Sequence, residues 1–192
     1  MDLLALIKTR RSIRKYTDEQ VSREDLEKVL EAGLYAANAG GAQRSMVVAV
    51  DDADLTKRLG RMNMAGFNRA GLIGSYVSHE QPSVIDDPSI KDGFYGAPSV
   101  LCVFCQERFA FSVTDAFCIA QTMTLEAHSL GLGSCIVSRA ETTFLSPEGQ
   151  KKSSCASGAC PKAMSAARSL SSVTATGPTP RQSRAEKDAL SS

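Results

Sequence analysis

The sequence has little charge imbalance and no long apolar run, and these two absences narrow what the protein can do. Its 22 lysines and arginines stand against 21 aspartates and glutamates, which gives a net charge of +1, so we expect no nucleic-acid partner. The N-terminal apolar run, residues 3–7, is too short for a secretory or membrane-spanning segment. We therefore expect a cytoplasmic protein with no membrane association.

The six cysteines give no sign of a disulfide framework. In a chain of this size, without a signal peptide, they are expected to be reduced thiols. Cys102 and Cys105 have the spacing of a redox or zinc pair, but they fall on a predicted strand, where positions three apart face opposite sides. The pattern favours core cysteines, and a redox or metal pair is the alternative.

Helical and strand-like segments alternate through the first 139 residues. Ser22 followed by acidic residues predicts the start of a helix whose buried stripe includes Leu26, Val29 and Leu34. Strands are expected at 46–50 and 97–104, with a helix between them that is capped by Asp52 or Asp54.

The longest predicted helix begins at Thr114–Asp115, with Phe117 on its buried stripe, and stops at Gly131. His128 lies near its end, where the helix dipole favours a cationic imidazole, so a structural role is expected for it. Residues 64–89 lose all periodicity and are typical of a lid or substrate-facing excursion, in which His79 is expected to be a solvated loop residue.

The most conspicuous feature is a dense basic cluster, RRSIRKY at residues 10–16, directly after the first predicted helix. Arginine presents a fixed fork of donors that suits phosphate oxygens, and a serine hydroxyl can complete such a cradle. A solvated basic turn is the alternative interpretation.

Two later segments are rich in small residues, as a close approach of the backbone to a flat ligand requires. In AANAGGAQRS, residues 36–45, Asn38 and Gln43 add directional amides, although a glycine-rich helix stop would look the same. The second such segment is LGSCIVSR, residues 132–139.

These segments in this order, together with FYGAPSVLCVF and LEAHSLGLGSCIVSRAETTF, resemble the FMN-dependent nitroreductase family over residues 1–150. The resemblance implies an α+β fold with a mostly antiparallel sheet flanked by helices. It also implies an intertwined homodimer that holds two FMN molecules at its interface. The first 152 residues would form this FMN-binding domain.

The resemblance also assigns roles to eight residues. The basic cluster would contact the FMN phosphate and ribityl chain, the glycine-rich loop would reach the FMN of the partner subunit, and the segment after GLGSC would offer backbone N–H groups to the N5 edge of the flavin. In that order the residues are Arg10, Arg11, Ser12 and Arg14; Asn38 and Gln43; Ser138 and Arg139.

The implied function is a ping-pong hydride transfer from NADH or NADPH through FMN to a nitroaromatic, a quinone or a similar electron-poor small molecule. The cofactor carries this chemistry, so no catalytic side chain and no metal is expected. Many members have a proline–tryptophan pair where this chain has Arg44–Ser45, which weakens inference about substrate shape. The alternative is a flavin-binding or interaction protein on the same scaffold with little or no turnover.

After Lys152 the composition changes abruptly. Residues 153–192 are dominated by small, hydroxylated and basic residues, and no aromatic occurs among them. Such a stretch buries too little apolar surface to offset its ordering entropy, so we expect it to be disordered. The family instead carries a helix, an apolar strand and a basic end here. Without that strand one sheet edge would stay unpaired, and without the basic end FMN would bind more weakly.

A change of reading frame near codons 152–153 explains the mismatch. With free choice of synonyms, the shifted frame of residues 154–164 reads LLREWGVPEGY, and the stretch up to Gly177–Pro178 reads ECRAFVIFGYCDGP. The last residues allow KPRRKGRVIK. These strings resemble the helix, strand and basic end of the family. A genuine low-complexity linker or interaction tail is the alternative.

Overall fold

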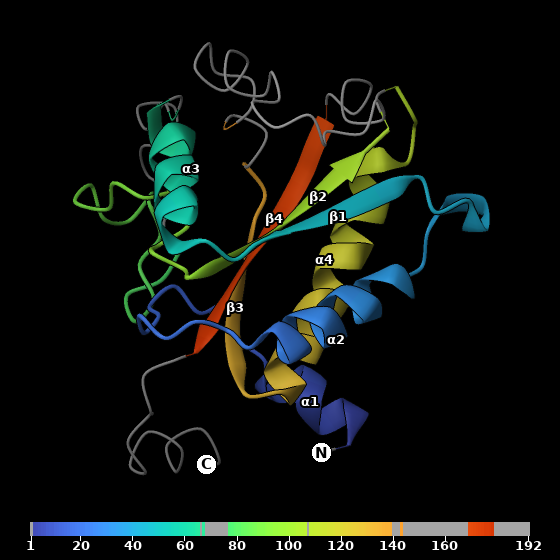
Figure 1. Cartoon of the computed structure of the whole chain (residues 1–192), viewed down its shortest axis with the longest axis horizontal. Coiled ribbons are helices and arrows are strands. Elements are labelled where there is room, and N and C mark those ends of the chain that lie inside the picture. The colour runs from blue at the N-terminus through green and yellow to red at the C-terminus, as the bar shows by residue number, and fades with distance from the viewer. Residues whose placement is uncertain are drawn as a thin grey trace.

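The structure, a computed structural model, describes residues 2–65, 67, 77–106, 108–139 and 143, and the backbone of 169–178. Its α-helices are α1 (Leu3–Thr9), α2 (Arg23–Leu34), α3 (Ala53–Ala65) and α4 (Ser112–Ser129), with a 3₁₀ turn at Ala39–Gly41. Its strands are β1 (Ser45–Val50), β2 (Ser99–Cys105), β3 (Leu132–Val137) and β4 (Ser169–Pro178). They form one antiparallel sheet in the order β1-β2-β4-β3 (Figure 1). The expected α+β fold is confirmed.

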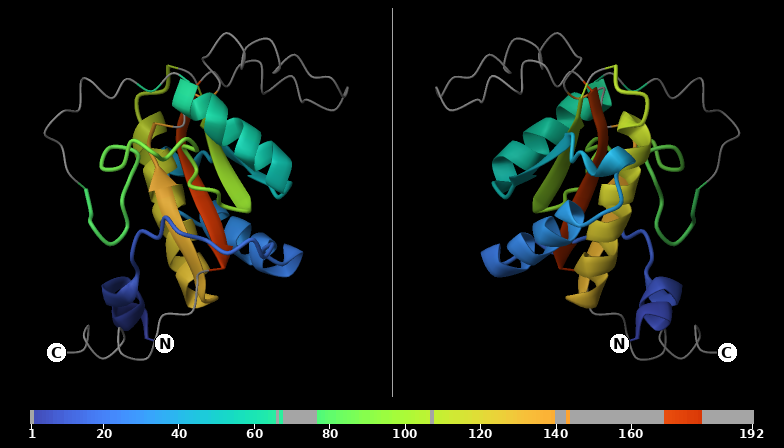
Figure 2. Two further views of the ribbon diagram at one scale, coloured as in Figure 1. Left: turned by 90° about the vertical axis from the view of Figure 1, so that its left-hand side faces the viewer. Right: turned by 90° about the vertical axis from the view of Figure 1, so that its right-hand side faces the viewer.

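Strand β2 is buried on both faces because helices cover the sheet from both sides (Figure 2). Leu101, Val103 and Cys105 pack in one apolar cluster with α2 and α4, whereas Cys102 belongs to a second cluster with α3. Both β2 cysteines are free thiols on opposite faces, as the strand period predicts, and burial raises the pKa of Cys102 to about 12. This arrangement agrees with core cysteines and not with a redox pair.

Local capping follows the sequence at several helix ends. The Ser22 hydroxyl accepts a hydrogen bond from the Asp25 amide at 3.1 Å, and Asp52, rather than Asp54, accepts one from the Leu55 amide at 2.7 Å. Gly131 follows α4 with a φ of 79°, in the left-handed conformation that glycine adopts freely.

Two predicted buried positions are wrong, and so is one helix start. Helix α4 begins at Ser112, before Thr114, because the Ser112 hydroxyl donates to Gln106 O at 2.7 Å and holds the preceding turn. Phe117 on α4 and Leu34 on α2 are 38% and 57% exposed, since each lies beside the stripe that faces the sheet.

The tail is not disordered along its whole length, because Ser169–Pro178 forms β4 between β2 and β3. Val173 is paired with Cys102 on one side and with Val137 on the other. Backbone pairing does not depend on side-chain identity, and the β-branched Val173, Thr174 and Thr176 favour extended structure. The expected unpaired sheet edge is therefore wrong. The rest of the tail lies outside the described residues.

Helix α1 is joined to the end of α4 by a polar contact: Thr9 Oγ1 lies 2.9 Å from His128 Nε2. Burial lowers the pKa of His128, and the charges of Arg10 and Arg11 lower it further. The expected structural role fits this contact, but the expected cationic imidazole is wrong, because two nearby guanidiniums and burial outweigh the helix dipole. His79 is exposed in its loop.

The lowered pKa of His128 predicts a loss of stability in mild acid. Above its ordinary value of 6.5 both the folded and unfolded states are neutral at this residue. As the pH falls below that value the unfolded state takes up the proton first, so the free energy of unfolding decreases until the pH has passed the lowered folded-state pKa. Proton NMR of the two histidines should show one titrating below 6.5, assigned by its loss in His128→Gln. A His128 signal that titrates above 6.5 would contradict this account.

Candidate flavin site

The N-terminal basic segment lies along strand β3 through the main chain. The Ile13 amide donates to Ser134 O at 2.9 Å, and Ser12 and Ser134 form a parallel bridge. This pairing brings the first and third predicted site segments together. The guanidinium carbons of Arg14 and Arg139 lie 5.9 and 5.8 Å from the ring centroid of Tyr95.

Arg14 is held from two directions by Gln81. Its backbone amide donates to Gln81 Oε1 at 2.7 Å, and its Nη1 donates to Gln81 O at 3.0 Å. The Nε of Arg14 is buried and has no hydrogen-bond partner within the described part of the chain. One donor of this guanidinium is therefore left unsatisfied by the described residues.

The loop that carries Gln81 is organised by the Asp86 carboxylate. This carboxylate accepts hydrogen bonds from the amides of Val77 at 2.8 Å, Ser78 at 3.3 Å and Ser83 at 2.7 Å. Desolvation pushes the pKa of Asp86 up, but these amides, with the Ser83 hydroxyl, bring it down to about 2. Asp86 therefore stays ionised at neutral pH and keeps the loop in the form that orients Arg14.

Arg139 is fixed by a buried asparagine that the sequence prediction missed. Asn63 is 0% exposed on α3, and its Nδ2 donates to Arg139 O at 3.1 Å and to Thr143 Oγ1 at 3.0 Å. Arg139 Nη2 in turn donates to Gly93 O at 2.8 Å. The available signal was an asparagine next to Met62 on the apolar stripe of a helix, where an amide is costly unless it is bonded.

The other predicted site residues of the basic cluster, Arg10, Arg11 and Ser12, differ from Arg14 in their burial and contacts. Arg11 is exposed and donates through Nη1 to Lys8 O at 2.7 Å and to Arg10 O at 2.9 Å, so its guanidinium is engaged in its own turn. Arg10 is half-buried, and Ser12 lies beside Ser134. Ser134 is 1% exposed, and its hydroxyl has no partner among the described residues.

The pKa of the Cys135 thiol reflects the positive charges that lie around it. Burial raises the pKa of Cys135, while the charges of Arg14, Arg139 and Arg10 each act to lower it. Three guanidiniums are therefore close enough to influence one atom of β3. An anionic group is the natural ligand for such a field.

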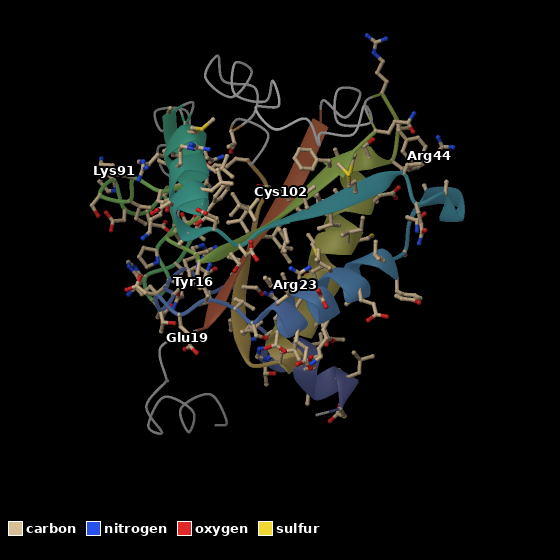
Figure 3. All side chains as sticks on the ribbon, viewed as in Figure 1. Tyr16, Glu19, Arg23, Arg44, Lys91 and Cys102 are labelled. Carbon is tan, nitrogen blue, oxygen red and sulfur yellow. The ribbon has the colours of Figure 1, made fainter. Side chains whose placement is uncertain are left out.

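The predicted loop residues Asn38 and Gln43 do not join this cluster within one chain. The Gln43 amide donates to Asn38 Oδ1 at 2.9 Å and Gln43 Nε2 donates to Leu34 O at 3.1 Å, so these amides hold the loop itself. The buried Asp115 on α4, also missed from the sequence, accepts from the Ala39 amide at 3.0 Å. In Figure 3, Arg44 lies at the opposite end of the molecule from Tyr16.

The third segment ends close to the arginines. Ser138 is exposed directly after β3, and the next residue, Arg139, is half-buried.

Among the described residues no group of three or more histidines, cysteines, aspartates or glutamates could hold a metal ion. No described helix combines the length and the apolar character needed to cross a bilayer.

Comparison with known proteins identifies the relatives of this chain. A model of the nitroreductase family matches residues 7–142. A protein of Archaeoglobus fulgidus with the provisional name NADH dehydrogenase/NAD(P)H nitroreductase is 43% identical over 135 residues, which are 69% of this chain and 65% of that protein. A protein of Methanothermobacter thermautotrophicus with the same provisional name is 29% identical over 137 residues, 69% of this chain and 59% of its own length. The chain thus spans less than two thirds of both relatives.

Among solved structures, a Bacteroides fragilis nitroreductase with bound FMN aligns with a TM-score of 0.69 at 23% identity, over 95% of this chain and 91% of that one. A nitroreductase with bound FMN from Desulfitobacterium hafniense aligns with a TM-score of 0.67 at 22% identity, over 94% and 90% of the two chains. At these identities the likeness shows a shared fold.

The close packing of α3 against the turn before β2 predicts that Gly60→Ala destabilises the site. The Gly93 amide donates to Gly60 O at 3.0 Å, and a Cβ at Gly60 would overlap the Asp92 carboxylate. That carboxylate accepts from the Phe94 amide at 2.7 Å and the Gly96 amide at 3.1 Å and so shapes the turn that presents Tyr95. We expect a loss of about 1–3 kcal/mol in the free energy of unfolding, measured by chemical denaturation.

Arg58→Ala, at an exposed position of the same helix, is the matched control and should change stability by less than about 0.5 kcal/mol. If Gly60→Ala and wild type have the same free energy of unfolding, the close packing of Gly60 against Asp92 does not hold the turn before β2.

Proposed function

Because the chain belongs to the nitroreductase family, we propose that it is an FMN-dependent NAD(P)H oxidoreductase whose acceptors are nitroaromatics, quinones or similar electron-poor compounds. The observation that carries this proposal is the convergence of Arg14 and Arg139 on Tyr95 beside β3. Two relatives with names of this activity and two FMN-bound structures of the same fold support it.

The residues present suit a phosphorylated cofactor. The buried Arg14 Nε and Ser134 Oγ have no hydrogen-bond partner within the described residues, and the charges of Arg14, Arg139 and Arg10 act on the nearby Cys135. Both atoms are donors that would suit an anionic acceptor. Arg10, Ser12 and Arg14 would hold the phosphate and ribityl chain, and the main chain at Ser138 and Arg139 would lie along the ring. Arg11 would contribute through its charge, since its donors already bond to its own turn.

FMN supplies the two-electron chemistry when it is bound, so the protein needs to bind and orient it and requires no side-chain nucleophile. Arg14 would place one fixed donor against the cofactor, because Gln81 holds both its backbone and its guanidinium. The backbone of Arg139 would keep its position through Asn63.

A second copy of the chain would complete the site. Asn38 and Gln43 lie away from the arginines of their own chain, so the loop would serve the partner's flavin. Apolar side chains stand exposed on α1, at the end of α2 and at the start of α4: Leu3, Leu4, Ile7, Leu34, Tyr35, Phe111, Val113 and Phe117. Burial in a homodimer would remove this surface from water.

The alternative function is a flavin-binding or interaction protein with little turnover, and the tail favours it. The family match ends at residue 142, and β4 is built from the serine- and threonine-rich Ser169–Pro178.

We attribute this tail to a change of reading frame. The shifted string ECRAFVIFGYCDGP overlaps β4 and would put apolar residues on the central strand. Sequencing across codons 152–153 should show a one-base insertion or deletion; an in-frame gene whose close relatives share the tail would exclude it.

Flavin binding tests the proposed function directly. Purified protein should be yellow and release FMN on denaturation, and NADH or NADPH should bleach it without oxygen. Arg14→Gln should weaken FMN binding about 10- to 100-fold, because a charge-assisted hydrogen bond is lost. The control Arg23→Gln, on exposed α2, should bind FMN as wild type does.

Colourless protein that takes up no FMN at saturating concentration would refute the proposal. Bound FMN that neither nicotinamide bleaches would instead support the alternative function. Circular dichroism of Arg14→Gln separates lost binding from lost folding, since Gln81 also depends on Arg14 for its contacts.

A further inference from the structure

A hollow of about 320 Å³ opens between Arg14–Lys15 and the loop before β2. Pro82, Ile90 and Tyr95 line its apolar part, and Arg14, Lys15 and Lys91 supply three cations. Its volume is at the lower end of the range for small-molecule sites. Arg14 belongs both to this hollow and to the candidate flavin site, so the two adjoin. Figure 3 shows Lys91 on the same side of the molecule as Tyr16.

The hollow carries a small excess of positive charge, three cations against two carboxylates. Two carboxylates also line it, but each is engaged by backbone amides: Asp92 by Phe94 at 2.7 Å and Gly96 at 3.1 Å, and Asp87 by Ser89 at 2.8 Å. Neither Lys15 nor Lys91 forms an ion pair among the described residues, whose ion pairs lie on α2.

The lysines therefore have donors to offer a ligand. Lys91 Nζ donates once, to Pro88 O at 2.9 Å, and an ammonium group has three donors. Lys15 is exposed at the mouth of the hollow. An anionic group between them would gain charge-assisted hydrogen bonds.

The wall behind the lysines is formed by Tyr95, which is held by several contacts. Tyr95 has a φ of 61°, in the left-handed region, and its ring lies within cation–π distance of both Arg14 and Arg139. The Tyr95 amide also donates to Asp92 O at 3.1 Å. A ligand here would meet a preformed surface of one aromatic ring, one proline and one isoleucine, which suits a planar base.

We propose that this hollow binds the adenylate half of the dinucleotide donor, with Lys15 and Lys91 on its phosphate groups and the base against the apolar wall. The inference rests on the proposed function, since it takes the nicotinamide to lie at the flavin and the rest of the molecule to extend past Arg14. The hollow thereby determines affinity for the donor and leaves affinity for the uncharged acceptor unchanged.

ADP-ribose tests the hollow separately from the chemistry, because it carries the adenylate half and cannot donate a hydride. Calorimetry on the purified full chain, with FMN added, should detect binding that weakens about tenfold in Lys15→Gln and in Lys91→Gln. Lys28→Gln, which removes the same charge from the solvent-facing side of α2, should bind ADP-ribose as wild type does. In steady-state assays the KM for NADH or NADPH should rise with both hollow variants, while kcat and the KM for a neutral quinone stay constant.

The possible outcomes distinguish the proposed adenylate-binding hollow from the proposed oxidoreductase function. Protein that binds FMN and is bleached by NADPH, but whose ADP-ribose affinity does not change in either lysine variant, refutes the hollow and keeps the oxidoreductase. Lysine-dependent binding of ADP-ribose by protein that takes up no FMN keeps the hollow and refutes the oxidoreductase. An equal loss in Lys28→Gln would reduce the effect to general charge and would overturn the site.

Discussion

The main-chain pairing of Ile13 with Ser134 is the contact on which the rest of the site depends. A basic heptapeptide in solution would spread its charges into water, and nothing local forces three arginines to share a region. Its attachment to β3 places the segment against a strand that is already fixed by the sheet. Arg14 and Arg139, which are 125 positions apart in the sequence, then both lie within cation–π distance of the Tyr95 ring.

Around this pairing, polar side chains hold the two arginines in place: Asn63 is buried, while Gln81 and Asp86 are half-buried. Gln81 orients Arg14 and Asn63 holds the backbone of Arg139, and each depends on a further group, Asp86 for the loop and α3 for the asparagine. Such networks cost desolvation energy unless every member is bonded, and what they provide is a defined geometry. Beside β3, Arg14 Nε and Ser134 Oγ are buried donors that have no hydrogen-bond partner among the described residues.

Strand β4 takes a central place in the sheet although its sequence is rich in serine and threonine. A central strand gains hydrogen bonds from both neighbours through its backbone, so a serine- and threonine-rich segment can occupy the position. Its neighbour β2 is nonetheless buried along its whole length and packs with apolar residues of three helices.

The resemblance to a known family predicted the class of fold. Local periodicity and backbone conformation predicted several element boundaries, the caps at Ser22 and Gly131, and a cap at Asp52 or Asp54, and the basic segment and small-residue turns are visible in the sequence itself. Tertiary structure alone decided which side chains meet: Asn63, Gln81, Tyr95 and Asp115 carry no local signal of their partners, which lie between 44 and 81 residues away. It also decided that His128 favours the neutral form and that the tail supplies a strand. The physical reason is that burial and long-range electrostatics are properties of the packed chain, whereas capping and periodicity are properties of a few consecutive residues.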